Sequence, residues 1–360
     1  MDNVNTKNKS RQLTVSRNGT LQNPPQVSLL VCMRNEAGYI ERCLASLFAQ
    51  DYPPESLEIW ILDGESCDGS WAIVERMAHG RSNCHLVKNP GITQARGWNL
   101  GIEYATGEVI GIVSAHSELA ADYVSKAVET LQRTGADLVG GPMRAIGSNN
   151  VGQAVALATS TPFGVGGARF HYTEREEEVD TVYMGLCRKE MYRGIGGFAT
   201  EMACNEDDEL SYRLLEHGGR IVCNPLIRSR YFNRATFPTL WKQYFKYGRW
   251  KPLVMQKHPH QIRLRQLIPS TFVAALVLSA VAASFSTTGR LALLFVAGSY
   301  LLANLAASLW TVRKGGWRHL PLLPLVFTVL HLSYGFGFLK GLFNFFLLNH
   351  FNNGTLTANT

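Results

Sequence analysis

Acidic residues are absent from the last two fifths of this 360-residue chain, because no Asp or Glu follows Glu216. Residues 1–216 hold all 28 acidic residues and 19 of the 35 Lys and Arg, whereas residues 217–360 hold the other 16 basic residues. A basic half can indicate nucleic-acid binding, but here the basic residues flank long apolar runs and form no soluble patch. The pattern favours a membrane partner and no nucleic acid.

Two further absences restrict the class of protein. The seven cysteines are odd in number and form no Cys-x-x-Cys pair, so neither a disulfide framework nor a zinc ribbon is indicated. The first 26 residues contain no apolar core of the kind that a signal peptide needs. We therefore expect residues 1–26 to form a disordered polar tail, and residues 351–360 a second tail.

Charge is absent from two apolar runs, residues 268–285 and 291–310, and each is about long enough to cross a bilayer as a helix. A third run, residues 320–348, is interrupted by prolines, glycines and Lys340. It forms either one long tilted helix or a span followed by a re-entrant or interfacial piece. Residues 267–350 are thus expected to form a transmembrane region of about three helices. Buried helices of a large soluble core are the less favoured alternative.

Basic residues flank these runs unevenly. Only Arg290 lies between the first two runs. Five basic residues precede the first run or follow the second: Arg263, Arg265, Arg313, Lys314 and Arg318. By the positive-inside rule, residues 1–266 and 311–319 are expected in the cytoplasm. The sequence therefore predicts a multi-pass protein of the plasma (inner) membrane with its soluble domain in the cytoplasm.

Between the tail and the membrane runs, apolar segments alternate with amphipathic ones, which is typical of an α/β fold with a mostly parallel sheet. This predicts one soluble domain over residues 27–238. The expected strands are Val27–Val31, Glu58–Leu62, Glu108–Val113, Asp137–Gly141 and Thr181–Cys187. The expected helices cover residues 36–49, 69–79, 92–105, 120–134 and 207–216.

In such a sheet, ligands bind beyond the carboxyl ends of the strands. The residues that follow the expected strands are Asn35-Glu36, Asp63 to Gly69, and Ser114-Ala115-His116. Each alone is compatible with a turn or with a structural histidine. Their joint placement favours a binding site.

A run of four carboxylates, Glu206 to Glu209, begins the last expected helix of the soluble domain. Neighbouring carboxylates repel one another, which raises the pKa of at least one and suits a general base. The alternative is a solvated helix start, where the helix dipole favours acidic residues.

Together these segments resemble the family-2 glycosyltransferases, whose nucleotide-sugar-binding domain has the GT-A fold. The resemblance runs from about Val27 to Trp250. It rests on four motifs in the family's order: Val27 to Glu36, Asp63 to Ser70, Ala95 to Glu108, and Glu206-Asp207-x-Glu209-Leu-x-x-Arg213. Further segments are similar to the glucosyltransferases of succinoglycan-type exopolysaccharide assembly: Pro162 to Gly167, Asn205 to Leu210, and Ser333 to Leu339.

This resemblance implies a role for each matching residue. Asp207 would be the general base, and Asp63 would hydrogen-bond a uracil ring. The remaining donor-binding residues would be Asn35, Glu36, Arg96 and Ser114. The acceptor or a diphosphate would contact Gly164, Gly166, Glu206, Lys246, Arg249 and Trp250.

The chain departs from the family at its metal motif, because Ser114-Ala115-His116 stands where Asp-x-Asp is usual. His116 can still ligate Mn2+ or Mg2+ through a neutral nitrogen. Glu118 is a possible substitute for the missing anionic ligand. Metal dependence therefore stays open.

Residues 239–266 combine basic and aromatic side chains without any acidic residue. Such a segment suits an interfacial helix that lies against anionic headgroups. Within it, Lys246 to Trp250 resembles the family's Gln/Arg-x-x-Arg-Trp motif.

The sequence therefore predicts a membrane-bound inverting glycosyltransferase in exopolysaccharide or glycan assembly. It would transfer one sugar from a nucleotide-sugar, expected to be a UDP-hexose, to a polyprenyl-diphosphate-linked saccharide. A processive polysaccharide synthase is the nearest alternative, disfavoured because such enzymes usually carry spans before the catalytic domain. A non-catalytic partner that binds sugar-nucleotide or lipid is the alternative from another class. The sugar, the linkage, the acceptor length and the oligomeric state stay open.

Overall fold

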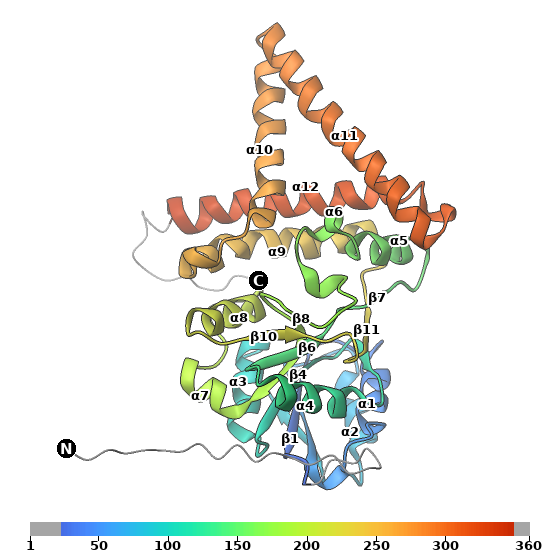
Figure 1. Cartoon of the computed structure of the whole chain (residues 1–360), viewed down its shortest axis with the longest axis vertical. Helices are drawn as coiled ribbons and strands as arrows, with labels where there is room; N and C mark the ends of the chain where they lie inside the picture. Colours follow the sequence, from blue (N-terminus) through green and yellow to red (C-terminus); the bar gives the residue numbers. More distant parts are fainter. Residues whose placement is uncertain (1–22, 349–360) are drawn as a thin grey trace, which may run out of the picture.

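The structure is a computed structural model that describes residues 23–348. Figure 1 shows an α/β domain beneath a group of long helices, two of which rise away from it as a hairpin. This confirms the predicted order of a mostly parallel α/β domain followed by apolar helices. Residues 1–22 of the predicted first tail and the whole predicted tail 351–360 lie outside the described residues.

The α/β domain is built on an eight-stranded sheet of order β3-β2-β1-β4-β9-β6-β10-β8. Strands β1, β2, β3 and β4 are parallel to one another, and β9 runs antiparallel between β4 and β6. The strands are β1 (Val27–Met33), β2 (Leu57–Asp63), β3 (Cys84–Lys88), β4 (Val109–Ser114), β6 (Leu138–Gly141), β8 (Glu177–Glu178), β9 (Tyr183–Arg188) and β10 (Ile221–Cys223). Every residue of β1 is buried, as expected for a central strand covered on both faces.

Helices cover the two faces of this sheet and bury a separate hydrophobic core on each. One core includes Leu44 and Val128, and the other includes Trp98 and Leu210. The helices of this domain are α1 (Ile40–Phe48), α2 (Ser70–Ala78), α3 (Gln94–Tyr104), α4 (Tyr123–Thr134), α5 (Asn150–Thr159), α6 (Pro162–Val165), α7 (Lys189–Ile195) and α8 (Glu206–Glu216). A small second sheet joins β5 (Ser117–Leu119), β11 (Ser229–Phe232) and β7 (Ala145–Ile146).

All five expected strands and all five expected helices of the soluble domain are present, with boundaries shifted by a few residues. The sequence analysis did not identify β3, β8 and β10 of the main sheet, the strands of the small sheet, or helices α5 to α7. Apart from α5, which has 10 residues, these elements are short. All five residues of β3 are only partly buried or exposed, so the strand lacks a long apolar run.

Four long helices follow the α/β domain: α9 (Phe237–Lys257), α10 (Leu264–Ala283), α11 (Thr287–Gly315) and α12 (Leu323–Leu342). Helices α10, α11 and α12 are long and apolar enough to cross a membrane. Figure 1 shows α10 and α11 as the rising hairpin, whereas α12 lies across its base beside α9. The third apolar run is thus one helix of 20 residues, followed by a short π-helix (Phe343–Leu348).

Candidate functional site

A cavity of about 1200 Å³ lies between the α/β domain and the long helices. Its walls come from the ends of β4 and β9, the start of α8, the α6 segment, one face of α9, and the inner sides of α10, α11 and α12. Of the residues predicted as functional, seven line it: Ser114, His116, Gly164, Gly166, Glu206, Asp207 and Lys246. The other six, Asn35, Glu36, Asp63, Arg96, Arg249 and Trp250, do not.

The four carboxylates at the start of α8 have different surroundings. Glu209 is buried and forms ion pairs with Arg213 at 2.7 Å and with His258 at 3.3 Å. Asp208 forms an ion pair with Lys251. Among the residues that the structure describes, no Lys, Arg or His nitrogen lies within 4.0 Å of a carboxylate oxygen of Glu206 or Asp207. These two carboxylates are therefore available to a ligand.

Burial and charge both act on these two free carboxylates. The side chain of Asp207 is exposed on the cavity wall, and the protein packed around it reduces its hydration, which raises the pKa of Asp207 above its usual value. The charge of Asp208 raises it further. Burial and the charge of Asp207 likewise raise the pKa of Glu206. A carboxyl group with a raised pKa is a better proton acceptor, as a general base requires.

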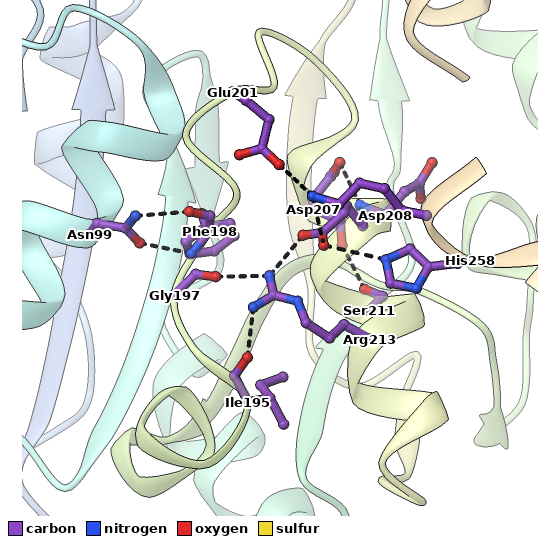
Figure 2. A network of polar contacts seen from close by, with 12 residues as sticks. Asn99, Ile195, Gly197, Phe198, Glu201, Asp207, Asp208, Ser211, Arg213 and His258 are labelled. Carbon is purple, nitrogen blue, oxygen red and sulfur yellow. Dashed lines mark hydrogen bonds and ion pairs between the residues drawn. The ribbon is translucent and has the colours of Figure 1, made fainter. Parts of the chain in front are cut away.

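Hydrogen bonds and an ion pair connect the loop that leads into α8 to the rest of the α/β domain, as Figure 2 shows. Arg213 donates to the carbonyl oxygens of Ile195 at 2.7 Å and Gly197 at 2.8 Å while it pairs with Glu209. Asn99 of α3 exchanges two hydrogen bonds with the backbone of Phe198, at 2.9 and 2.7 Å. The position of Asp207 is therefore fixed from the core of the α/β domain.

The residues after β1, β2 and β4 meet at one edge of the sheet, as the sequence predicts. Asn35 accepts from the backbone N–H of Cys67 at 2.9 Å, and its own N–H donates to Ser66. Glu36 contacts Nδ1 of His116 at 3.2 Å, and Nε2 of His116 lies 3.3 Å from the hydroxyl of Ser114. The β1, β2 and β4 loops are thus tied to one another beside the cavity.

Two predicted donor-binding residues have other surroundings. Asp63 is fully buried and forms an ion pair with Lys88 at 2.8 Å. Arg96 is exposed at the start of α3, and its side chain lies over Gly91, where a Cβ would come within 2.5 Å of it. Gln94 and Trp98 of the same helix line the cavity instead.

Backbone strain is concentrated around this edge. Five non-glycine residues near this edge have left-handed φ angles between 50° and 63°: Asn35, Glu65, Ile92 and Asn205 outside the strands and helices, and Met184 near the start of β9. Asn tolerates this conformation, but a β-branched residue such as Ile92 does so at a cost of about 1–3 kcal/mol. Such strain is typical of sites whose geometry the surrounding fold imposes.

One face of α9 contributes positive charge to the cavity. Thr239, Lys242, Gln243 and Lys246 follow the spacing of one helical face and all line the wall, together with Arg234 before the helix. Within residues 23–348, no carboxylate oxygen lies within 4.0 Å of the charged nitrogens of these three cations. The sequence analysis identified Lys246 but missed Arg234 and Lys242, although the four-residue spacing of Lys242 from Lys246 was a usable signal.

Arg249 and Trp250 lie on another side of α9, towards α12. The backbone of Arg249 contacts Gly337 and Gly341, and the ring of Trp250 lies 5.5 Å from that of Phe345. Of the three positions that match the family motif, Lys246, Arg249 and Trp250, only Lys246 lines the cavity, and the intervening Tyr247 lines it as well.

The glycines of the α6 segment are required by packing. A Cβ on Gly164 would lie 2.1 Å from the carbonyl oxygen of Ala158. Gly166 has a φ of 62°, and a Cβ there would lie 2.6 Å from Cβ of Arg265. The α6 segment is therefore a close-packed part of the cavity wall. It also contacts α12, because a ring nitrogen of His331 lies 2.8 Å from the carbonyl oxygen of Phe163.

The far end of the cavity is apolar and lies among the long helices. It is lined by Ile268, Pro269 and Phe272 of α10, by Phe295, Val296, Ser299, Tyr300 and Ala303 of α11, and by Leu330, His331 and Tyr334 of α12. The cavity lining thus combines carboxylates from α8, cations from α9 and mainly apolar side chains from the long helices α10, α11 and α12.

The described residues contain no group of three or more His, Cys, Asp or Glu side chains arranged to hold a metal ion. His116 and Glu36 are a pair of neighbouring ligand groups. A cation here would need further ligands from a bound molecule.

Comparison with known proteins gives three findings. The profile of Glycosyl transferase family 2 matches residues 28–196. A dolichyl N-acetyl-alpha-D-glucosaminyl phosphate 3-beta-D-2,3-diacetamido-2,3-dideoxy-beta-D-glucuronosyltransferase of Methanococcus voltae is 29% identical over 88% of this chain and 98% of its own. The succinoglycan biosynthesis protein ExoA of Rhizobium meliloti is 29% identical over 86% of this chain and 93% of its own.

Two solved structures share the fold. A mannosyltransferase from Pyrobaculum calidifontis, in complex with GDP-Man and Mn2+, has a TM-score of 0.57 and 20% identity over 89% of this chain and 88% of its own. S. aureus TarS 1-349 in complex with UDP-GlcNAc has a TM-score of 0.50 and 15% identity over 88% and 91%.

Proposed function

The chain belongs to glycosyl transferase family 2 through residues 28–196 and is a glycosyltransferase, and from that premise we propose its reaction. It transfers one sugar from a nucleotide-sugar to a saccharide carried by a polyprenyl phosphate or diphosphate, at the surface of the membrane. The configuration at the anomeric carbon of the transferred sugar is inverted. This reaction serves the assembly of an exopolysaccharide or another glycan.

The continuous cavity is the observation that supports this acceptor. Its lining includes the carboxylates Glu206 and Asp207, the cations Lys242 and Lys246, and the apolar sides of the long helices. A lipid-linked acceptor carries the three matching kinds of group, which are sugar hydroxyls, phosphate and isoprenoid. The Methanococcus voltae relative is named for an acceptor of this kind, a dolichyl-linked sugar phosphate.

Asp207 is the proposed general base. A sugar hydroxyl is a poor nucleophile, so a carboxylate must take its proton while the hydroxyl oxygen attacks the anomeric carbon of the donor. Asp207 lies on the cavity wall, carries a raised pKa and has no cationic partner among the described residues. Glu206 lies beside it and is placed to orient the acceptor.

The nucleotide diphosphate leaves from the face opposite the attack, so an α-linked donor gives a β-linkage. The leaving group gathers negative charge, and we assign its stabilisation to Arg234 of the cavity wall. Mn2+ or Mg2+ held by His116 and Glu36 would supply further charge stabilisation when bound. Because the pair provides only two ligand groups, the donor's phosphates must complete the site.

Asn35, Asp63, Arg96 and Ser114 are retained as the proposed donor-binding residues. Asp63 needs rearrangement for this role, because its carboxylate now pairs with Lys88. The solved relatives were captured with GDP-Man and with UDP-GlcNAc. We propose a UDP-hexose as the donor.

Calorimetric titration of the detergent-purified protein with UDP and with GDP, each with and without Mn2+, tests donor binding. UDP binding that Mn2+ strengthens supports a uridine donor and a role for His116. Binding of GDP alone contradicts the uridine donor.

The variant Asp207→Asn tests the base. We expect the transfer rate to a polyprenyl-diphosphate-linked sugar to fall by about 10²- to 10⁴-fold, while nucleotide affinity stays unchanged, because the amide cannot accept the proton. Ser211→Ala is the matched control, since its hydroxyl contacts only the backbone oxygen of Asp207 and the hydroxyl of Thr181. Full activity in Asp207→Asn would exclude this residue as the base.

A further inference from the structure

Helix α12 packs against α9 so closely that their backbones touch. A Cβ on Gly337 would lie 2.2 Å from the carbonyl oxygen of Phe245, and one on Gly341 would lie 2.2 Å from that of Arg249. In the other direction, a Cβ on Gly248 would lie 2.1 Å from the carbonyl oxygen of Tyr334. Figure 1 shows the two helices side by side below the hairpin. Wherever α9 lies relative to the membrane, α12 therefore lies alongside it.

Helix α9 cannot lie in the hydrocarbon core. It carries Lys242, Lys246, Arg249, Lys251 and Lys257, and each Lys or Arg costs about 2.5–3.5 kcal/mol at the centre of a bilayer. It is also tied to the soluble domain, because Asn205 donates to the carbonyl oxygen of Tyr247 at 3.0 Å and Lys251 pairs with Asp208.

The first half of α12 is tied to the same domain. Leu323 and Val326 share a buried cluster with Ala154 and Val155 of α5. Further along, His331 contacts the carbonyl oxygen of Phe163 in α6 at 2.8 Å. Contacts with the α/β domain and α9 therefore hold α12 along its whole length.

The opposite side of α12 is an apolar stripe. Its members are partly or fully exposed and lie away from Gly337 and Gly341: Leu325, Leu332, Phe336 and Leu339, continued by Phe343 of the π-helix. Val329 lies at the margin of this stripe and packs against the buried cluster that contains Leu323 and Val326. Lys340 is exposed on the flank of this stripe, with its ammonium 5.8 Å from the ring centre of Phe245. A helix with one apolar free face and a basic residue at its margin suits the boundary between headgroups and acyl chains.

We propose that α12 lies in the plane of the membrane surface with this stripe in the acyl boundary, and that only the hairpin of α10 and α11 crosses the bilayer. Helix α10 crosses α12 near Gly335, where a Cβ would lie 2.6 Å from the carbonyl oxygen of Pro269. From Pro269 to Ala283 the helix rises about 21 Å. If α12 is buried about 5–10 Å deep, as interfacial helices are, the hairpin reaches across a hydrocarbon core of about 30 Å.

This arrangement returns the chain after α12 to the side of the catalytic domain, whereas three crossings would leave it on the other side. Arg290 next to the hairpin turn would be the one basic residue of the described membrane region on the far side. The proposal concerns membrane topology and does not depend on which reaction the cavity performs.

The test is labelling of the full-length chain by a membrane-impermeant maleimide in spheroplasts of a bacterial host. The native Cys67 is exposed in the catalytic domain and reports the side of that domain. One variant, Thr360→Cys, reports the end of the chain, and a second, Thr288→Cys, reports the exposed first turn of α11, next to the connection from α10. Peptide mass spectrometry reads each site separately, before and after permeabilisation.

We expect Thr288→Cys to react in intact spheroplasts, and both Cys67 and Thr360→Cys to react only after permeabilisation. Reaction of Thr360→Cys in intact spheroplasts, with Cys67 still protected, would show three crossings and overturn the proposal. Protection of Thr288→Cys in intact spheroplasts would overturn the crossing of the hairpin.

Discussion

The two walls of the cavity that face each other from α8 and α9 hold opposite charges in different ways. On the α8 wall, Asp208 and Glu209 have cationic partners, and Glu206 and Asp207 have none among the described residues. On the α9 wall, Lys251 is paired, whereas Lys242 and Lys246 have no carboxylate partner in the described part of the chain. On each wall, some charged side chains therefore form ion pairs within the protein, and others are available to bind a ligand.

The segregation of charge along the sequence explains this difference. Because no acidic residue follows Glu216, every cation of α9 and α10 that pairs must pair with the catalytic domain. Lys251 pairs with Asp208, Lys257 with Glu201, and Arg265 with Asp180. The ion pairs therefore join the two halves of the molecule, and the unpaired charges face each other across the cavity between them.

The largest expected effect comes from removing the ion pair between Lys251 of α9 and Asp208 of α8, because Lys251 is buried. The variant Lys251→Met leaves the charge of Asp208 without a partner. Loss of one member of a buried pair costs about 3–5 kcal/mol, and we expect the lower end because Asp208 is partly exposed. Thermal unfolding of the detergent-purified protein measures this loss of stability.

The matched control is Lys126→Met. Lys126 forms an ion pair with Glu129 at 2.8 Å, but both side chains are exposed on α4. Exposed pairs contribute about 0–1 kcal/mol, so this variant should unfold close to the native temperature. Equal unfolding temperatures for the two variants would show that the ion pair between Lys251 and Asp208 does not stabilise the fold.

A change at the apolar end of the cavity should affect only the lipid. Ala303→Trp places an indole among the cavity residues of α11. We expect the KM for a long-chain polyprenyl acceptor to rise about 10-fold, equivalent to about 1.4 kcal/mol, because the isoprenoid loses space. The KM for a short-chain, water-soluble acceptor should not change.

Leu302→Trp is the control for this prediction, since Leu302 lies next to Ala303 but is 71% exposed and outside the cavity lining. Steady-state kinetics with both acceptors make the comparison. An equal rise in KM for the long and the short acceptor in Ala303→Trp would indicate a general disturbance of α11. It would contradict the proposal that the apolar end of the cavity binds the isoprenoid.

The charges around Asp207 should also control the dependence of activity on pH. The general base works when deprotonated, so the rate should fall as the pH drops through the raised pKa of Asp207. Lys251 lowers this pKa, and its removal in Lys251→Met should move the acidic fall in rate to higher pH. Measurement of kcat/KM against pH for both proteins checks the direction. A shift to lower pH would contradict the assignment of the base.

Some of this site could be predicted from the sequence, because strand ends and the carboxylate run are local features. The sequence predicted that Glu206 to Glu209 form one cluster, but not which carboxylates are free. Glu209 has one partner four residues away, Arg213, which helical spacing could have identified. The partner of Asp208 lies 43 residues later, on a helix whose position depends on tertiary packing.

Hydropathy predicted the long helices for the same local reason, but length and composition cannot distinguish a helix that crosses the membrane from one that lies along it. The sequence analysis treated Gly335 and Gly337 as interruptions of the third apolar run. In the structure, Ser333, Gly337 and Gly341 are spaced four residues apart along a buried face of α12, where the glycines admit the backbone of α9. That small-residue spacing was a signal for helix contact.

The smallest expected effect comes from an unpaired cation of the same helix. Lys246→Ala removes an exposed charge of the cavity wall that has no carboxylate within 4.0 Å in the described residues. We expect no change in the unfolding temperature, but a KM for donor or acceptor about fivefold higher at low salt, since an exposed charge contributes about 1 kcal/mol. The difference should shrink at physiological ionic strength because salt screens exposed charges. Lys257→Ala, on the same helix but outside the cavity lining, should leave KM unchanged. A lower unfolding temperature with an unchanged KM in Lys246→Ala would show that Lys246 stabilises the fold, as Lys251 does, and does not bind a ligand. That result would contradict the division of the α9 cations into paired and ligand-facing ones.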